Sequence, residues 1–318
     1  MSPEINDIIE FLKSSYPENE SILVGCRAES SISYECCEYD IIVLQKEIGK
    51  SNIKKSNKNY NVCKVNEKTL EIYFLNKEEL IYNADINFRN YAEVTNSVFK
   101  STSENEFNRK RHYNIETLKT ITKRKSIKFA LDCTKVIKLI INGTLDQRLF
   151  SLYLKTMSFN VLELFIQLFH KDFPRPTHLK YQVNQIKEDN TRIKESIDIV
   201  LDYLQLERSN ISTITRSEKS LFFLLHHTKH LNHHIHNHKV SEILRSKLNY
   251  FKNQSMYVDA NLLIHSFIVR QNLDANYIKN YNRLLNQILD VQIKEKTILL
   301  KEFETLFNII KRTIRNLY

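Results

Sequence analysis

The chain of 318 residues contains only three glycines, Gly25, Gly49 and Gly143. In so glycine-poor a sequence, we expect each glycine to occupy a position where only glycine fits sterically. No stretch reaches the roughly 18 consecutive apolar residues that a membrane-spanning helix needs. The segment 1–16 carries acidic residues and lacks the basic and then apolar pattern of an export signal. We therefore expect a cytoplasmic protein that has no membrane partner.

Cysteine usage argues against two further kinds of site. The chain has five cysteines, an odd number that includes one adjacent pair, which makes a poor disulfide framework and suits a reducing compartment. No two of them form a CxxC pair, so we do not expect a zinc–thiolate site. The five are Cys26, Cys36, Cys37, Cys63 and Cys133.

Charge is distributed unevenly along the chain, whose formal net charge is +10. Residues 1–100 hold 12 Lys and Arg against 16 Asp and Glu, and the remaining residues carry a balance of +14. An acidic head that gathers a metal ion and a basic body that attracts an anion are one interpretation. Lysine-rich helix faces exposed to water are the other, because a basic isoelectric point alone does not identify a nucleic-acid-binding protein.

Short apolar runs in the first hundred residues predict a small sheet. The runs at 22–24, 41–44, 62–65 and 70–75 are rich in β-branched and aromatic residues and are bounded by polar ones. A first helix is predicted to begin at Pro3, with its apolar residues along one stripe. The polar, basic stretch 49–61 is predicted to form a loop.

From about Glu104 the pattern is helical almost throughout. Apolar residues between Ile127 and Ile141 follow helical spacing, and Gly143 provides a C-terminal stop. Two prolines within 171–176 end the next helix. The predicted helices are 145–170, 178–187, 191–206, 217–236, 240–250, 261–269, 275–289 and 293–317. The chain is thus predicted to be α+β, with a small mixed-sheet head at 1–104 and an all-α domain at 105–318.

Three acidic residues stand out in the head. Glu38 and Asp40 begin a predicted strand, and residues at i and i+2 of a strand point to the same face. Glu71 is isolated in the apolar run 70–74. Buried carboxylates are unfavourable unless something positive neutralises them, and Mg²⁺ is usually held by carboxylates together with substrate phosphates. The three acids are therefore predicted to form one metal site, provided that the two strands are neighbours.

The order and spacing of these motifs resemble the DNA polymerase β-type nucleotidyltransferase superfamily. Residues 25–28 (GCRA), followed by 38–41 (EYDI), are similar to the Gly-Ser-Arg-Ala and Asp-hydrophobic-Asp signature of its minimal and aminoglycoside-type members. The third carboxylate of the pattern falls on Glu71, so the match covers roughly 20–75. The helical body resembles, more loosely, the HEPN-like or substrate-binding domains that follow such heads. The RNase motif of HEPN domains has no match, so RNA cleavage is not expected.

The resemblance implies a function. Gly25, Cys26 and Arg27 would bind the nucleotide phosphates, while Glu38 and Asp40 would hold Mg²⁺ or Mn²⁺. Glu71 would complete the metal site and act as the general base. The partners implied are an NTP, with ATP as first choice, and an acceptor hydroxyl on a small molecule, an RNA or a protein. A homo-oligomer is left open.

Two departures from the family pattern keep alternatives open. Cys26 stands where serine is usual, and Glu38 stands where the first aspartate is usual. A catalytically weak nucleotide-binding or antitoxin-like protein is the alternative, and a purely structural helical adaptor is a third. The histidine-rich run 226–238 places four histidines on one helix face, which is compatible with Zn²⁺ or Ni²⁺ capture. A polar helix end is the simpler interpretation of that run.

Overall fold

The computed structural model describes residues 3–24, 26–27, 33–45, 60–76, 104–143, 146–170, 174–227, 238–269 and 275–315. The chain divides into two compact units, Met1–Thr117 and Leu118–Tyr318. The division falls inside the long helix α4 (Glu104–Ile141), which begins at the residue where the helical pattern of the sequence begins.

The first unit is built on a mixed four-stranded sheet of order β1-β2-β4-β3. The central strands β2 and β4 are parallel, and each outer strand is antiparallel to its neighbour. All four predicted strands are confirmed. The elements are α1 (Pro3–Ser15), β1 (Glu20–Val24), β2 (Tyr39–Gln45), β3 (Tyr60–Val65) and β4 (Lys68–Asn76). Most of the predicted loop 49–61 lies outside the described residues, and its last two residues already belong to β3.

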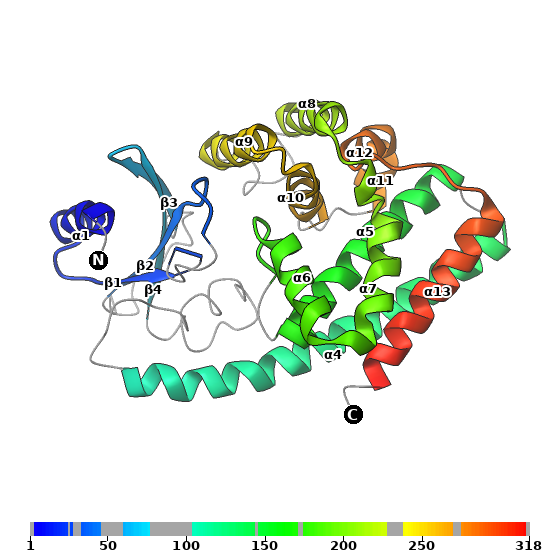
Figure 1. Cartoon of the computed structure of the whole chain (residues 1–318), viewed down its shortest axis with the longest axis horizontal. Helices are drawn as coiled ribbons and strands as arrows, with labels where there is room; N and C mark the ends of the chain where they lie inside the picture. The colour runs from blue at the N-terminus through cyan, green and yellow to red at the C-terminus, as the bar shows by residue number, and fades with distance from the viewer. Residues whose placement is uncertain are drawn as a thin grey trace. The chain divides into compact units, whose positions relative to one another are not determined.

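The helix α1 covers one face of this sheet (Figure 1). Its apolar stripe, with Ile8 and Leu12, packs against alternate residues of the central strands, such as Ile41 and Ile72. Because successive side chains of a strand point to opposite faces, the residues between them point away from α1. The sheet therefore has one face devoted to a hydrophobic core, while Asp40 and its neighbours in register lie on the other.

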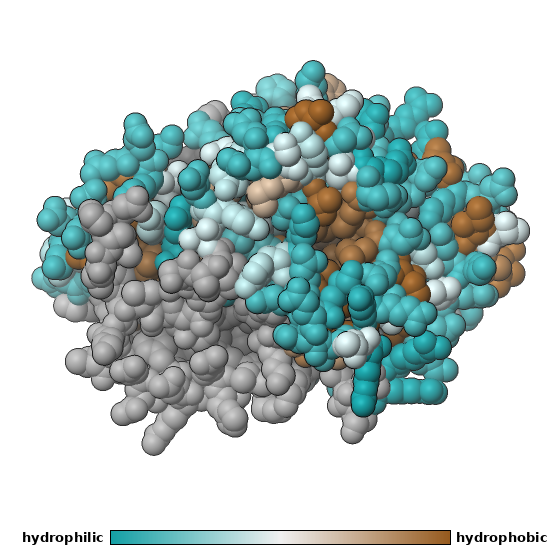
Figure 2. Space-filling model, in the orientation of Figure 1, coloured by the Kyte–Doolittle hydropathy of each residue, from teal (hydrophilic) through white to brown (hydrophobic). Residues whose placement is uncertain are grey.

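The second unit is entirely helical among its described residues. Beyond α4 it comprises α5 (Gln147–Phe165), a π-helical turn (Ile166–His170), α6 (Leu179–Asp189), α7 (Thr191–Leu204), a 3₁₀ turn (Leu206–Arg208), α8 (Ile211–His227), α9 (His238–Asn253), α10 (Tyr257–Val269), α11 (Ala275–Asn280), α12 (Asn282–Ile288) and α13 (Lys296–Arg315). The visible face of this unit is mainly hydrophilic, with hydrophobic residues gathered between the helices (Figure 2).

The helix α5 forms the centre of this unit. It packs against α7, α10, α12 and α13, and buries large side chains such as Phe159, Leu162 and Phe165. The helical stretch Gln147–Phe169 is long and apolar enough to cross a membrane by length and composition, and 72% of its apolar 18-residue segment is buried within the protein. A core helix meets the same criteria, so this stretch is explained by its packing.

The structure corrects several predicted helix boundaries. The helix α8 starts at Ile211, six residues before the predicted start, because Asn210 and Thr213 cap it reciprocally. The Asn210 side chain accepts from the Thr213 N–H at 3.0 Å, and the Asn210 N–H donates to Thr213 Oγ1 at 2.9 Å. The predicted helix 275–289 is interrupted at Tyr281, giving α11 and α12.

The helix that ends before Gly143 is confirmed, and Gly143 has the positive φ of +69° that a left-handed C-terminal stop requires. Its buried face differs from the apolar pattern. Cys133, Val136 and Ile140 are buried, whereas Ile127 and Leu131 are exposed. Regular helical spacing identifies the apolar residues that share a face of a helix. Which face becomes buried depends on where the neighbouring helices pack.

Candidate functional site

The parallel pairing of β2 and β4 brings the predicted acidic residues together. Asp40 is the register partner of Glu71, and Glu38 lies just before β2. Because the two strands are parallel, their N-terminal residues lie at the same end of the sheet. The condition set by the sequence, that the two strands be neighbours, is therefore met.

The carboxylates of Glu38, Asp40 and Glu71 form a tight, buried cluster. One oxygen from each lies within 4.8 Å of the other two, and the residues are only 6%, 6% and 7% exposed. Three ionised carboxylates at this separation repel one another, and burial increases the repulsion. A divalent cation relieves it, and an all-oxygen donor set suits Mg²⁺ or Mn²⁺. The three residues are thus a possible donor set for such an ion, and the predicted metal stays a prediction.

Tyr73 is a member of the site that the sequence analysis missed. Its hydroxyl donates to Glu71 Oε2 at 2.8 Å. The two residues are two positions apart on β4 and therefore share the face that α1 leaves uncovered. The spacing in the sequence could have indicated this contact, because a tyrosine two residues after an acid on a strand lies on the same face and can reach its carboxylate. The contact fixes the orientation of the Glu71 carboxylate.

The segment after β1 reaches the same edge of the sheet. Antiparallel pairing places Val24, the last residue of β1, beside Asp40, so Cys26 follows close to the acids. Gly25, the predicted phosphate-turn residue between them, lies outside the described residues. The structure therefore brings one of the two predicted nucleotide-binding residues that it describes, Cys26, to the carboxylate cluster.

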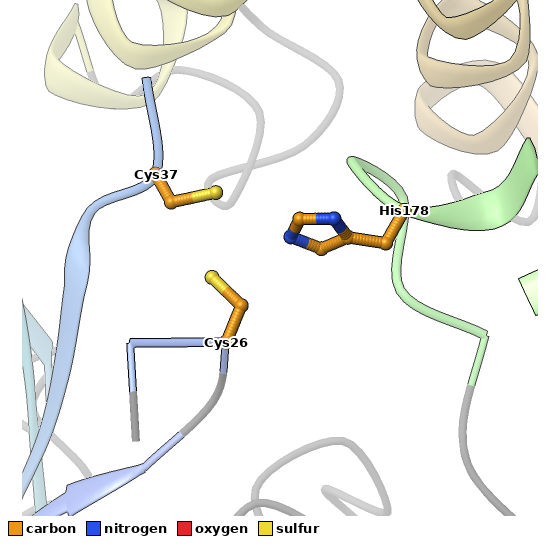
Figure 3. Close-up of side chains that lie close together, drawn as sticks. All are labelled: Cys26, Cys37 and His178. Carbon is orange, nitrogen blue, oxygen red and sulfur yellow. The ribbon is translucent and has the colours of Figure 1, made fainter. Parts of the chain in front are cut away.

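The buried Cys26 thiol is held neutral. Its pKa is raised well above the ordinary value, first by a hydrogen bond with Cys37, then by burial and by the charges of Cys37, Asp40 and Glu38. Figure 3 shows the two side chains, Cys26 from the turn after β1 and Cys37 from the segment that leads into β2. His178, also labelled there, belongs to the helical unit, where it precedes α6. A neutral thiol is a poor nucleophile.

Arg27, the other predicted phosphate ligand, contacts the protein itself. Its Nε and Nη2 donate to the Cys37 carbonyl at 3.1 and 3.0 Å, and Nη2 also donates to the Glu35 carbonyl at 3.0 Å. The guanidinium lies 5.0 Å from the centre of the Tyr39 ring. Arg27 thus secures the segment that delivers Glu38 and Asp40 to the sheet, which is a positioning role.

The histidine-rich run contributes no assembled site to the described residues. His226 and His227 end α8, and His238 begins α9, while the histidines between them lie outside the described residues. The rings of His226 and His227 make an edge contact at 5.4 Å. The prediction of metal capture by this run therefore stays a prediction.

Comparison of the chain with protein-family models, with curated proteins and with solved structures gives no match. The function of the carboxylate cluster is therefore argued from its own geometry and chemistry.

Proposed function

We propose that the first unit carries a metal-dependent nucleotidyltransferase centre, which moves a nucleoside monophosphate from an NTP to an acceptor hydroxyl. The observation that carries the proposal is the buried cluster of Glu38, Asp40 and Glu71, with an oxygen of each within 4.8 Å of the others. The order of the motifs adds support, since β1 ends at Val24 beside Asp40 and Cys26 follows close to these acids. ATP is the first choice of donor, and the helical unit is a candidate acceptor domain.

Each residue has a role in this proposal. Glu38 and Asp40 hold Mg²⁺ or Mn²⁺, and Glu71 completes the site, with its carboxylate oriented by Tyr73. The bound cation supplies charge neutralisation for the triphosphate and the leaving group. The acceptor oxygen attacks the α-phosphorus, the bond to the pyrophosphate oxygen breaks, and the acceptor proton passes to Glu71.

A second candidate, nucleotide binding with little or no turnover, is favoured by the environment of Cys26 and Arg27. The Cys26 thiol interacts with Cys37, and the Arg27 guanidinium donates to the Glu35 and Cys37 carbonyls. Both side chains therefore hold the loop before β2, whereas the family pattern implies phosphate contacts for this turn. A chain of this kind retains a cation and an NTP but transfers nothing.

Pyrophosphate release separates the two candidates. The full chain is incubated with Mg²⁺ or Mn²⁺ and each α-labelled NTP, and both pyrophosphate and label transferred to the protein or to an added acceptor are measured. We expect Glu38→Gln and Asp40→Asn to lose turnover by roughly a hundredfold or more, as removal of a group that stabilises the transition state does. Glu10→Gln on the exposed side of α1 is the matched control, because it removes one charge at a distance from the cluster.

The same proteins are then melted with and without NTP and metal. An NTP- and metal-dependent rise in melting temperature without pyrophosphate supports the non-turnover candidate. Turnover that is equal in the wild type, Glu38→Gln and Asp40→Asn contradicts the assignment of the site. The absence of both turnover and any shift contradicts both candidates and leaves the structural adaptor.

A further inference from the structure

Half of the residues that line one cleft in the helical unit are arginines. The cleft has a volume of about 480 Å³, and four guanidinium side chains and one carboxylate border it. Arg148 comes from α5, Arg208 from the 3₁₀ turn, Arg216 from α8 and Arg283 from α12. The carboxylate belongs to Asp290, which follows α12. Residues distant in the sequence therefore converge on one cavity by tertiary packing.

The charges of this arginine cleft do not balance. Four guanidinium groups face one carboxylate, which leaves an excess of three positive charges. Asp290 pairs with Arg208 and Arg216, while Arg148 and Arg283 form no ion pair within the described part of the chain. The Arg208 and Arg216 side chains are still 41% and 52% exposed, so a ligand can reach them. Positive charges confined in this way attract an anion.

Asp290 builds the floor of the arginine cleft. Its backbone is left-handed, with φ +47°, a conformation that aspartate tolerates better than most side chains. Its carbonyl accepts from the buried Lys155 Nζ at 3.1 Å, while its carboxylate holds Arg208 at 3.5 Å and Arg216. Asp290 thus pairs with two arginines through its carboxylate and is itself held by Lys155 through its carbonyl. The cleft is a built arrangement, and two of its arginines have their positions set before any ligand arrives.

We propose that the arginine cleft binds a compact polyphosphate group, the diphosphate or triphosphate of a small molecule. Guanidinium groups match phosphate oxygens in bidentate geometry. The volume of about 480 Å³ is typical of a small-molecule site. An excess of three positive charges suits the several negative charges that a diphosphate or triphosphate concentrates in a small volume. This site lies in the helical unit and does not rest on the proposed chemistry of the first unit.

Calorimetric titration of the full chain tests the proposal. Pyrophosphate, triphosphate and ADP are titrated in buffer containing EDTA, so that no cation links a phosphate to the acidic cluster. The double variant Arg148→Gln/Arg283→Gln leaves the Asp290 pairs in place, and we expect it to bind pyrophosphate roughly a hundredfold more weakly, about tenfold for each arginine. The matched control is Arg192→Gln/Arg312→Gln, which removes two exposed arginines of α7 and α13. We expect the control to change the affinity by no more than about twofold.

Each result of these titrations either supports or overturns the proposed phosphate site. Equal affinities for pyrophosphate and ADP identify the phosphate group as the ligand, and tighter binding of ADP identifies a nucleotide; both support the proposal. No binding of any of the three, or the same loss in the control, overturns it. Arginine-dependent binding of a single-stranded RNA but not of pyrophosphate also overturns it. The double variant Glu38→Gln/Asp40→Asn should bind as the wild type does, and loss of binding there would assign the anion to the first unit.

Discussion

Asp40 on β2 and Glu71 on β4 lie side by side as register partners, so two buried carboxylates face each other across neighbouring parallel strands. With Glu38 they place three acidic groups within 4.8 Å of one another, an arrangement in which ionised carboxylates repel one another and oppose folding. In a site that binds a ligand of opposite charge, the binding groups repel one another when the ligand is absent, and this repulsion lowers the free energy of unfolding.

Asp40→Asn should raise the melting temperature of the chain in EDTA, because it removes one of three mutually repelling charges. We expect a gain on the order of 1 kcal/mol in the free energy of unfolding. Circular dichroism during thermal unfolding measures it, since the chain has no tryptophan. Mn²⁺ should then stabilise the wild type more than the variant. A variant that melts lower in EDTA and keeps the full response to Mn²⁺ would contradict the assignment of the cluster as a metal site.

Tyr73→Phe should weaken metal binding without removing a ligand. The hydroxyl that donates to Glu71 Oε2 at 2.8 Å is lost, and the carboxylate becomes free to rotate. Groups that orient a metal ligand typically change affinity by roughly 10- to 100-fold, and we expect the lower end for this neutral donor. Electron paramagnetic resonance of Mn²⁺ titrated into both proteins gives the two dissociation constants. Equal constants would show that Tyr73 has only a structural role.

Arg27→Lys should destabilise the first unit, because a lysine ammonium cannot reproduce the planar pattern of donors to the Cys37 and Glu35 carbonyls. We expect a loss of about 1–3 kcal/mol in the free energy of unfolding, measured by urea titration with circular dichroism. Arg124→Lys, on an exposed position of α4, is the control and should change little. A variant with unchanged stability but weaker NTP binding would restore Arg27 to the phosphate-binding role that the sequence implied.

Cys26 should be the slowest of the unit's described thiols to be alkylated, because the thiolate is the reactive form and its pKa is strongly raised by Cys37 and by burial. Iodoacetamide at pH 8, followed by mass spectrometry of the peptides, should label the half-buried Cys36 at least about tenfold faster. Raising the pH to 10 should not close the gap, since ordinary thiols are already deprotonated there. In the helical unit, burial raises the pKa of Cys133 to about 12, so Cys133 should also react slowly. Equal labelling of Cys26 and Cys36 would contradict this environment.

The acidic cluster was predictable because its signal is local and periodic. Glu38 and Asp40 share a strand face by their spacing, and Glu71 interrupts an apolar run. The one assumption needed was that the two strands pair with each other in the sheet, and they do. The contacts of Arg27 could not be predicted in this way. The carbonyls that it contacts lie up to ten residues away, and the path of the intervening chain decides whether the guanidinium faces a ligand or the backbone.

In the helical unit, too, the contacts between elements could not be predicted from the sequence. The helices themselves were predictable from their periodicity, but the buried stripe of α4 was not, since Ile127 and Leu131 proved to be exposed. The arginine cleft left no pattern in the sequence at all. Its side chains come from positions between Arg148 and Arg283, and only the packing of α5, α8 and α12 brings them together.

The buried side chain of Lys155 donates to the Asp290 carbonyl beside the arginine cleft. Its pKa is lowered to about 7, chiefly by burial; the charges of Arg208 and Lys294 act in the same direction, while Asp290 and Glu207 oppose the shift. Between pH 7 and its ordinary value of 10.5, the unfolded chain holds a proton that the folded chain does not. Raising the pH through this window therefore stabilises the folded state, and lowering the pH removes that stability.

Lys155→Met should abolish this contribution, because methionine fills a similar volume and does not titrate. The difference in unfolding free energy, variant minus wild type, should be most positive near pH 7 and fall towards pH 10.5, by at most ~1.4 kcal/mol per pH unit. Urea titrations at several pH values measure it. His265, whose pKa burial lowers to about 3, acts in a separate window below pH 6.5, so the two contributions do not overlap. A difference that stays constant from pH 7 to 10.5 would mean that Lys155 is charged in the folded protein throughout, with the Asp290 carbonyl as sufficient compensation.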